Sequence, residues 1–185
     1  EIDLSVGSAV AFAGCLTAYL FEAGSAWGLG VAPALIMAIL GALVIGAGIG
    51  ALSGVIRVRF GVPTFITTLA WMTVLTGAAQ LITGGFPLTP FPEGYNFLGG
   101  GYLLGVPFPA ILFLFVFIAT HVLMGYTTFG RAIYAVGGNA EAARLSGIDV
   151  GRIKISVMAI VAVLAALAGI MQSAEIMSGS ASTAR

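Results

Sequence analysis

Residues 137–154 read GGNAEAARLSGIDVGRIK, a polar and charged stretch between two of the most apolar runs of the chain. The 185 residues include only seven arginines and lysines. Four of these lie in or next to the stretch, namely Arg131, Arg144, Arg152 and Lys154. A chain with so few basic residues does not collect them in one short loop by chance. We therefore expect this loop to be the place where a partner binds.

The composition places the rest of the chain in a lipid bilayer. Hydrophobic residues make up 59% of the chain and charged residues 8%, whereas a soluble domain has about 25% charged residues. So few charged side chains could not cover the surface of a soluble fold of this size. The formal net charge is zero, so no general attraction to nucleic acid is predicted.

Five apolar runs approach or exceed the length of about 20 residues that crosses a bilayer. They are residues 5–21, 29–56, 64–83, 103–126 and 155–177. The first is marginal, and the second is long enough to tilt, break or pass beyond the interface. The predicted fold is thus all-α: a polytopic transmembrane helix bundle of about five spans, with a short cytoplasmic helix in the 127–154 loop.

The charges of the connecting segments support this topology. Connectors 57–63 and 127–154 contain six of the seven basic residues, and connectors 22–28 and 84–102 contain none. Basic residues mark the cytoplasmic side of a membrane protein. Residues 1–4 are then also cytoplasmic, and Arg185 at the end of the chain is the exception.

Small residues recur at four-residue spacing in two of the spans. The two sets are Gly46, Gly50 and Gly54, and Ala165, Gly169 and Ser173. Such stripes let helix backbones approach closely in lipid, where no hydrophobic force drives helices together. They predict close helix–helix contacts.

The third span carries two polar stripes. At about 100° per residue, Thr64, Thr67, Thr68 and Trp71 share one sector of the inner half, and Thr73, Thr76, Gln80 and Thr83 share another sector of the outer half. The amide of Gln80 needs hydrogen-bond partners outside its own helix. The outer stripe either makes interhelical hydrogen bonds or lines a hydrated route for a hydroxyl-rich, uncharged solute.

Two acidic residues lie close to the apolar runs. Asp3 either favours the positive end of the first helix or belongs to a broken helix deeper in the membrane. Glu175 stands near the outer end of the last run, where water can reach it. Our candidates for the substrate pathway are Asp3, Thr73, Thr76, Gln80 and Thr83.

The 127–154 loop should contain one short helix, residues 140–146. Asn139 is a good N-cap, Glu141 suits the positive helix end, and Gly147 is a plausible left-handed terminator. A helix this short is not stable alone in water. It must therefore dock, either on the inner face of the bundle or on a partner.

Residues for hydrolytic, redox or metal chemistry are scarce. There is one histidine, His121, one cysteine, Cys15, and no metal-ligand spacing. A single cysteine cannot form an internal disulfide. The phosphate-binding pattern GxxxxGK[ST] is absent, so the chain does not bind ATP by that route. We predict no catalytic residue and no metal site.

Three passages carry a resemblance to a known family. Residues 130–157 (GRAIYAVGGNAEAARLSGIDVGRIKISV) resemble the cytoplasmic coupling loop of permease subunits of bacterial ABC sugar importers, the ribose, xylose and galactoside group. Residues 1–12 (EIDLSVGSAVAF) and 62–85 (VPTFITTLAWMTVLTGAAQLITGG) are similar to two further segments of that family. Glu1 stands where the family usually has glycine. The resemblance covers essentially the whole chain.

The resemblance implies a multi-pass subunit of the bacterial inner membrane that pairs with a second permease copy. It implies a separate cytoplasmic ABC ATPase, which would bind ATP and Mg, and a periplasmic sugar-binding protein, with no cofactor in this chain. Residues 1–185 would form a single but partial permease domain that lacks N- and C-terminal parts. The coupling segment for the ATPase would comprise Gly138, Asn139, Glu141, Ala142, Ala143, Leu145, Ser146 and Gly147.

The implied function is import of a monosaccharide by alternating access, driven by the partner ATPase. One alternative keeps the machinery and changes the cargo to branched-chain amino acids, nucleosides or a signalling molecule. A more distant alternative is an ion-coupled secondary transporter or a channel, which usually places ionisable groups near the middle of the membrane. An intramembrane enzyme would need more than His121.

Overall fold

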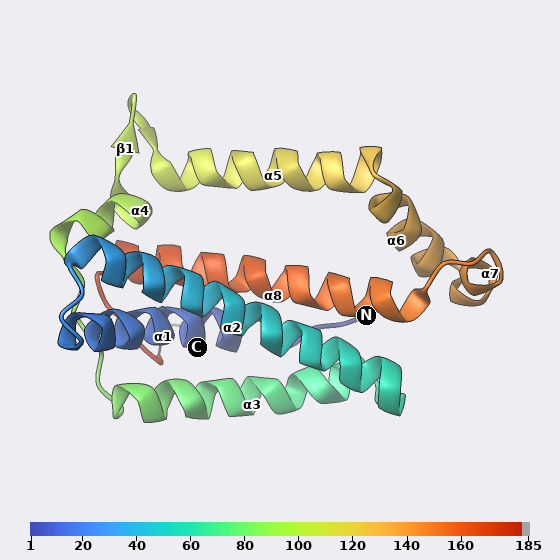
Figure 1. Ribbon diagram of the computed structural model, residues 1–185, viewed down its shortest axis with the longest axis horizontal. Helices are drawn as coiled ribbons and strands as arrows, with labels where there is room; N and C mark the ends of the chain where they lie inside the picture. The colour runs from blue at the N-terminus through green and yellow to red at the C-terminus, as the bar shows by residue number, and fades with distance from the viewer. Residues whose placement is uncertain (183–185) are drawn as a thin grey trace.

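The computed structural model describes residues 1–182. In this part of the chain, five helices are long and apolar enough to span a membrane. They are α1 (Val6–Ala26), α2 (Val31–Phe60), α3 (Thr64–Thr83), α5 (Phe108–Tyr126) and α8 (Val150–Glu175). All five extend along the long axis of the molecule (Figure 1). The predicted five-span, polytopic α-helical fold is confirmed.

The boundaries of α3 agree with the prediction, because backbone signals bracket the helix. Pro63 directly precedes it, and Gly84 follows it with a left-handed φ of 60°. By contrast, α5 begins at Phe108 instead of residue 103. The chain just before it forms a small antiparallel hairpin of β1 (Tyr102–Leu103) and β2 (Val106–Pro107). The predicted start of this span was therefore wrong by five residues, which form most of the hairpin.

Helix α8 begins at Val150, five residues before the predicted apolar run. Asp149 caps it, since its side chain accepts a hydrogen bond from the backbone N–H of Arg152 at 3.0 Å. Helix α2 is 30 residues long and so exceeds the length needed to cross a bilayer. Both long helices carry their basic residues beyond the apolar part of the span.

Close contacts at small residues hold α2 and α1 against α8. A side chain at Gly50 would overlap the carbonyl of Met158, and one at Gly54 would overlap the backbone of Ile155. On the other side of α8, a side chain at Gly169 would overlap the carbonyl of Val10 in α1. The close contacts predicted from both small-residue stripes are thus confirmed.

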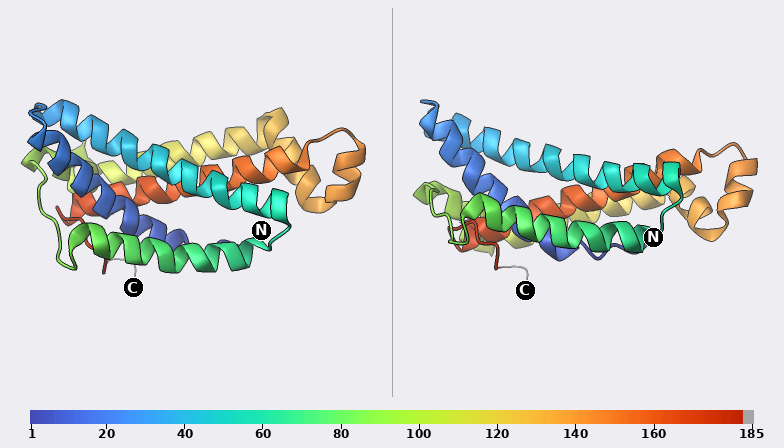
Figure 2. Two further views of the ribbon diagram at one scale, coloured as in Figure 1. Left: turned by 60° about the horizontal axis from the view of Figure 1, so that its bottom comes forward. Right: turned by 90° about the horizontal axis from the view of Figure 1, so that it is seen from below.

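Helix α1 starts inside the bundle. The N-terminal residues run as extended chain before the helix begins at Val6 (Figures 1 and 2). The backbone N–H of Leu4 donates to Thr68 Oγ1 of α3 at 3.1 Å. The first residues of α1 line a cavity together with Ser53 of α2 and Ala162 of α8. The first span looked marginal because the predicted run ended at residue 21, before Glu22, whereas α1 continues to Ala26.

Six of the seven basic residues gather at one end of the bundle, which we call the basic end. Arg57 and Arg59 lie in the last turn of α2, and α8 begins close by. Helices α6 (Thr128–Gly138) and α7 (Ala140–Leu145) lie beyond the spans at the same end (Figure 1). The predicted exception, Arg185, lies outside the described residues.

The opposite end is closed by packed loops. The connector after α3 contains η1 (Glu93–Asn96) and α4 (Phe97–Gly100). The hydroxyl of Tyr95, which is fully buried, donates to the carbonyl of Ile170 at 3.0 Å and lies 2.7 Å from Ser173 Oγ. Leu88 and Gly179 exchange two backbone hydrogen bonds. As predicted, this connector contains no further spanning helix.

Helix α5 stands apart from the other four spans. None of its residues is buried, and Phe113 and Phe115 are 72% and 67% exposed. Its packed neighbours in the described chain are α4, β2 and α6, which flank it in sequence. Figure 1 shows the separation between α5 and α8. The core consists of α1, α2, α3 and α8.

Candidate functional site

Helix α7 is fixed at both ends by the residues that the sequence singled out. Asn139 Oδ1 accepts hydrogen bonds from the N–H groups of Glu141 and Ala142, both at 3.0 Å. At the other end Gly147 has φ 83°, and the N–H of Ile148 donates to the carbonyl of Ala143 at 3.0 Å. These are an N-cap and a Schellman termination. The predicted short helix is confirmed, ending one residue earlier than expected.

The residues of the predicted coupling segment are exposed, with one exception. Ala143 is buried, with 4% of its surface exposed. Leu145, in contrast, is 76% exposed. The other predicted residues are also exposed: Gly138, Asn139, Glu141, Ala142, Ser146 and Gly147. The structure thus brings all eight residues into one small projecting element, and their role in coupling stays a prediction.

Two oppositely charged side chains lie on the exposed face of α7. Arg144 Nε donates to Glu141 Oε2 at 3.1 Å, and Arg144 also pairs with Glu141 Oε1. This hydrogen bonding lowers the pKa of the Glu141 carboxyl from its ordinary value and raises the pKa of the Arg144 guanidinium. Both groups are fully exposed, so the pair offers a charged patch to a partner more than it stabilises the fold.

Helix α6 is an element that the sequence interpretation missed. Thr127 caps it by accepting a hydrogen bond from the N–H of Gly130 at 3.0 Å. Its less exposed residues recur with helical spacing on one side and are Phe129, Ala132, Ile133 and Val136. Arg131 and Tyr134 are exposed on the other side. The threonine cap and this apolar spacing were the signals available in the sequence.

Helices α6 and α7 together link two spans. The chain leaves α5 at Tyr126, passes through both short helices, and enters α8 at Val150. Because α7 projects beyond the ends of the spans (Figure 1), an object that displaces it must also displace the connected ends of α5 and α8. The arrangement can therefore transmit a push or a pull into the membrane-spanning part.

A hollow runs along the outer polar stripe of α3. It has a volume of about 560 Å³, and its walls include Thr73, Thr76 and Gln80 of α3 and Ser8 of α1. Within residues 1–182, the hydroxyls of Thr73 and Thr76 bond to their own helix at 2.8 and 2.7 Å. No side-chain hydrogen bond joins Gln80 to another described residue. Thr73, Thr76 and Gln80 thus face the hollow, and within residues 1–182 none of these three side chains forms a hydrogen bond to another helix.

A second hollow of about 620 Å³ continues toward the end of the bundle opposite the basic end. Gln80 lines both hollows, and Thr83, Phe86 and Ser180 line the second. Thr83 itself is buried and bonds back to Ala79 at 2.9 Å. No charged side chain lines either hollow. Four of the five predicted pathway residues therefore line two uncharged hollows that meet at Gln80, and their role in the pathway stays a prediction.

The inner polar stripe of α3 serves packing. Thr64, Thr67 and Thr68 are buried, and Thr68 accepts the hydrogen bond from Leu4 described above. Ser8, which faces the outer stripe across the hollow, was not predicted. No sequence signal marks it, because its position depends on where α1 starts.

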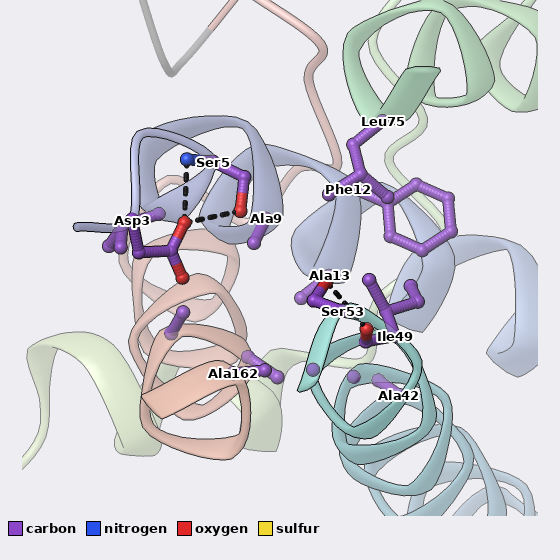
Figure 3. A pocket seen from close by; sticks show the side chains of 15 residues that line it. Asp3, Ser5, Ala9, Phe12, Ala13, Ala42, Ile49, Ser53, Leu75 and Ala162 are labelled. Atoms are coloured by element: carbon purple, nitrogen blue, oxygen red, sulfur yellow. Dashed lines mark hydrogen bonds between the residues drawn. The ribbon is translucent and has the colours of Figure 1, made fainter. Parts of the chain in front are cut away.

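Asp3 lies apart from these hollows. Its Oδ1 accepts hydrogen bonds from Ser5 N at 2.8 Å and Ser5 Oγ at 2.6 Å, just before α1 (Figure 3). Asp3 lines an enclosed cavity of about 20 Å³ with Ser53 and Ala162, which has room for one water molecule. Residues 1–5 around Asp3 are not helical, and Asp3 lies two residues before Ser5, the N-cap of α1. Its role in the pathway stays a prediction. The structure does not bring Asp3 together with the four other predicted pathway residues.

The described residues contain no cluster of side chains that could bind a metal ion. Residues 1–182 contain no group of three or more His, Cys, Asp or Glu residues that could hold a metal ion. His121 lies on α5 between the rings of Phe117 and Tyr126, with centroid distances of 6.5 and 5.9 Å. Both rings belong to the same helix as His121, which is itself exposed.

The known family and the known proteins that match this chain are all described as permeases. Residues 1–184 match the family described as branched-chain amino acid transport system / permease component. The chain is 41% identical over 181 residues to the ribose import permease protein RbsC of Escherichia coli K12, covering 96% of this chain and 54% of the relative. It is 38% identical over 170 residues to RbsC of Bacillus subtilis 168, covering 91% and 50%.

A third relative is the L-arabinose ABC transporter permease protein AraH of Azospirillum brasilense. It is 35% identical over 183 residues, covering 99% of this chain and 52% of the relative. The chain thus spans about half the length of the curated relatives that it matches. No solved structure matches it significantly.

Proposed function

Because the chain belongs to the branched-chain amino acid transport system / permease component family, we propose that it is the membrane permease subunit of an ATP-driven ABC importer for a monosaccharide. The similarity to ribose and L-arabinose permeases supports a sugar as the cargo. The uncharged hollows along α3, with their hydroxyl and amide groups, suit a neutral polyol, which needs hydrogen bonds but no counter-charge.

The observation that carries this proposal is the geometry of α7. A capped six-residue helix projects beyond the spans at the basic end, with Leu145 exposed at its surface. Such a helix is too short to persist alone, so its exposed face fits a groove on a docking partner. The proposed partner is a cytoplasmic ABC ATPase, which binds and hydrolyses ATP with Mg, while this chain holds no cofactor.

The remaining proposed partners follow from the same role. A second permease copy would face the open side of the α1–α3 hollows and complete the route. A periplasmic sugar-binding protein would deliver the sugar at the end opposite the basic end. The concentration of basic residues at one end supports a cytoplasmic orientation for α7 and a place in the bacterial inner membrane.

The proposed mechanism is alternating access. Closure of the ATPase on ATP moves α7, and the connected ends of α5 and α8 move with it. A ligand shifts such an equilibrium only through different affinities for the two states. The ATPase must therefore contact α7 differently when the route opens outward and when it opens inward.

The test replaces Leu145 by arginine in the complete transporter reconstituted in vesicles. A charged side chain at this exposed apolar contact should abolish most sugar uptake and lower the ATPase activity stimulated by the sugar-binding protein. Glu141→Arg, which also repels Arg144, should act in the same direction. Leu104→Arg is the matched control for an exposed leucine, since Leu104 is 99% exposed in the turn between β1 and β2 at the other end of the bundle. Normal uptake in Leu145→Arg would refute the docking role.

One alternative has a specific observation in its favour. The Asp3 carboxylate lies on the non-helical residues before Val6, beside a small cavity between α1, α2 and α8, and ion-coupled secondary transporters place ion sites at non-helical segments within the membrane. However, Ser5 already occupies one Asp3 oxygen, and the cavity is too small for a solute. Uptake that follows a proton or sodium gradient without ATP would favour this alternative.

A further inference from the structure

Glu1 joins three helices at the basic end. Its Oε1 lies 2.7 Å from Lys154 Nζ of α8 and 3.3 Å from Arg57 Nε of α2. Its Oε2 accepts a hydrogen bond from Thr64 Oγ1 of α3 at 2.7 Å. One carboxylate therefore binds the ends of α2, α3 and α8 at the same time.

This cluster is partly sheltered from water. The side chains of Glu1 and Lys154 are each 23% exposed, and that of Arg57 is 30% exposed. Partial burial alone would raise the pKa of Glu1. The hydrogen bonds from Lys154, Thr64 and Arg57 outweigh that effect and lower the pKa to about 2. Glu1 is thus ionised at physiological pH, and it faces two cations with a single carboxylate.

The cluster sits next to the proposed coupling element. Only residues 146–149 separate α7 from α8, and Lys154 lies near the second turn of α8. On the other side, Arg57 Nη1 also donates to the carbonyl of Gly61 at 3.1 Å. Gly61 forms the corner between α2 and α3 with a left-handed φ of 69°. A displacement of α7 that carried the first turns of α8 would therefore stretch the contact between Lys154 and Glu1.

We propose that Glu1 is a positioning residue for the coupling step, holding the first turns of α8 against the α2–α3 corner in one of the two transport states. This inference rests on the proposed function, because it needs a force that arrives through α7. An ion pair that is present in one state and stretched in the other biases the equilibrium between them. The pair thereby links sugar movement to ATP hydrolysis.

The first test measures sugar transported per ATP hydrolysed in vesicles that contain the complete transporter. Glu1→Gln and Lys154→Gln should each lower this ratio about two- to thirtyfold, the range of coupling effects found along such networks. Arg59→Gln is the matched control, because it removes the same charge from the same end and Arg59 has no ion pair within residues 1–182. An equal effect of Arg59→Gln and Lys154→Gln would overturn the proposal.

The second test exchanges the charges. Lys154→Glu alone should give the largest loss, and the double variant Glu1→Lys with Lys154→Glu should recover part of the ratio. Recovery stays partial because the new lysine lies near Arg57. A purely structural role would lower the amount of folded protein and leave the ratio unchanged, which would also overturn the proposal.

Comparison with Leu145→Arg separates this inference from the proposed function. If Leu145→Arg uncouples the transporter and Glu1→Gln does not, the role of Glu1 is refuted and the importer remains supported. If Leu145→Arg has no effect, the coupling role of α7 fails, and the positioning role of Glu1 fails with it.

Discussion

At the scale of single residues, a few polar atoms decide where α7 begins and ends. Asn139 supplies one oxygen to two backbone N–H groups that have no partner within a helix. Gly147 adopts a left-handed backbone that other residues reach only with strain. Sequence alone identified both residues, because capping depends on short-range chemistry. It could not show that Ala143 alone would be buried, since the surface that covers it comes from other elements.

We expect Asn139→Ala to loosen α7 without disturbing the bundle. Loss of an N-cap costs about 1 kcal/mol, so the amides of Glu141 and Ala142 should exchange hydrogen roughly fivefold faster. Asn139→Asp is the matched control, because a carboxylate oxygen accepts the same bonds. Hydrogen exchange measured by mass spectrometry on the purified transporter checks this, and unchanged exchange in Asn139→Ala would show that docking alone orders the helix.

At the scale of helices, the small-residue stripes were predictable and the helix starts were less so. The four-residue spacing of Gly50 and Gly54 was enough to predict their close contacts with another helix. The early start of α8 was signalled by Asp149 but hidden by the charges of Arg152 and Lys154, which interrupt the apolar run. The internal start of α1 depends on the bond from Leu4 to Thr68, a contact between distant residues that no local pattern reveals.

The contact between α2 and α8 predicts a contrast between two neighbouring glycines. Gly50→Val must force α2 away from the Met158 carbonyl and should cost about 1–3 kcal/mol, as overpacking does. Gly48→Val, on the same helix, meets open space and should have little effect. Thermal unfolding in detergent measures both. Equal midpoints for the two variants would mean that the helices are not packed as described.

At the scale of the whole molecule, the hollows along α3 and the projecting helix α7 occupy different regions of one bundle. The five-span topology and the sidedness of the charges were predictable, because they follow from composition and the distribution of basic residues. The position of Ser8 beside the hollow along α3 was not. It depends on how α1 tilts and where it begins, which only the packed structure shows.

Labelling of single cysteines tests the route and its cargo. Gln80→Cys should react with a membrane-impermeant thiol reagent added from outside, and saturating ribose should slow the reaction in the complete transporter. Thr68→Cys should not react, because Thr68 is fully buried, and the native Cys15 is buried as well. Protection by leucine in place of ribose would favour an amino acid as the cargo.

The isolation of α5 has a mechanical consequence. The four core helices can shift against one another only by repacking interlocked backbones, as at Gly50 and Gly169. Within residues 1–182, the packed neighbours of α5 are α4, β2 and α6, which flank it in sequence. A pull on α7 would therefore act on α8, which packs against α1 and α2, and on α5, which within residues 1–182 packs only against elements that flank it in sequence.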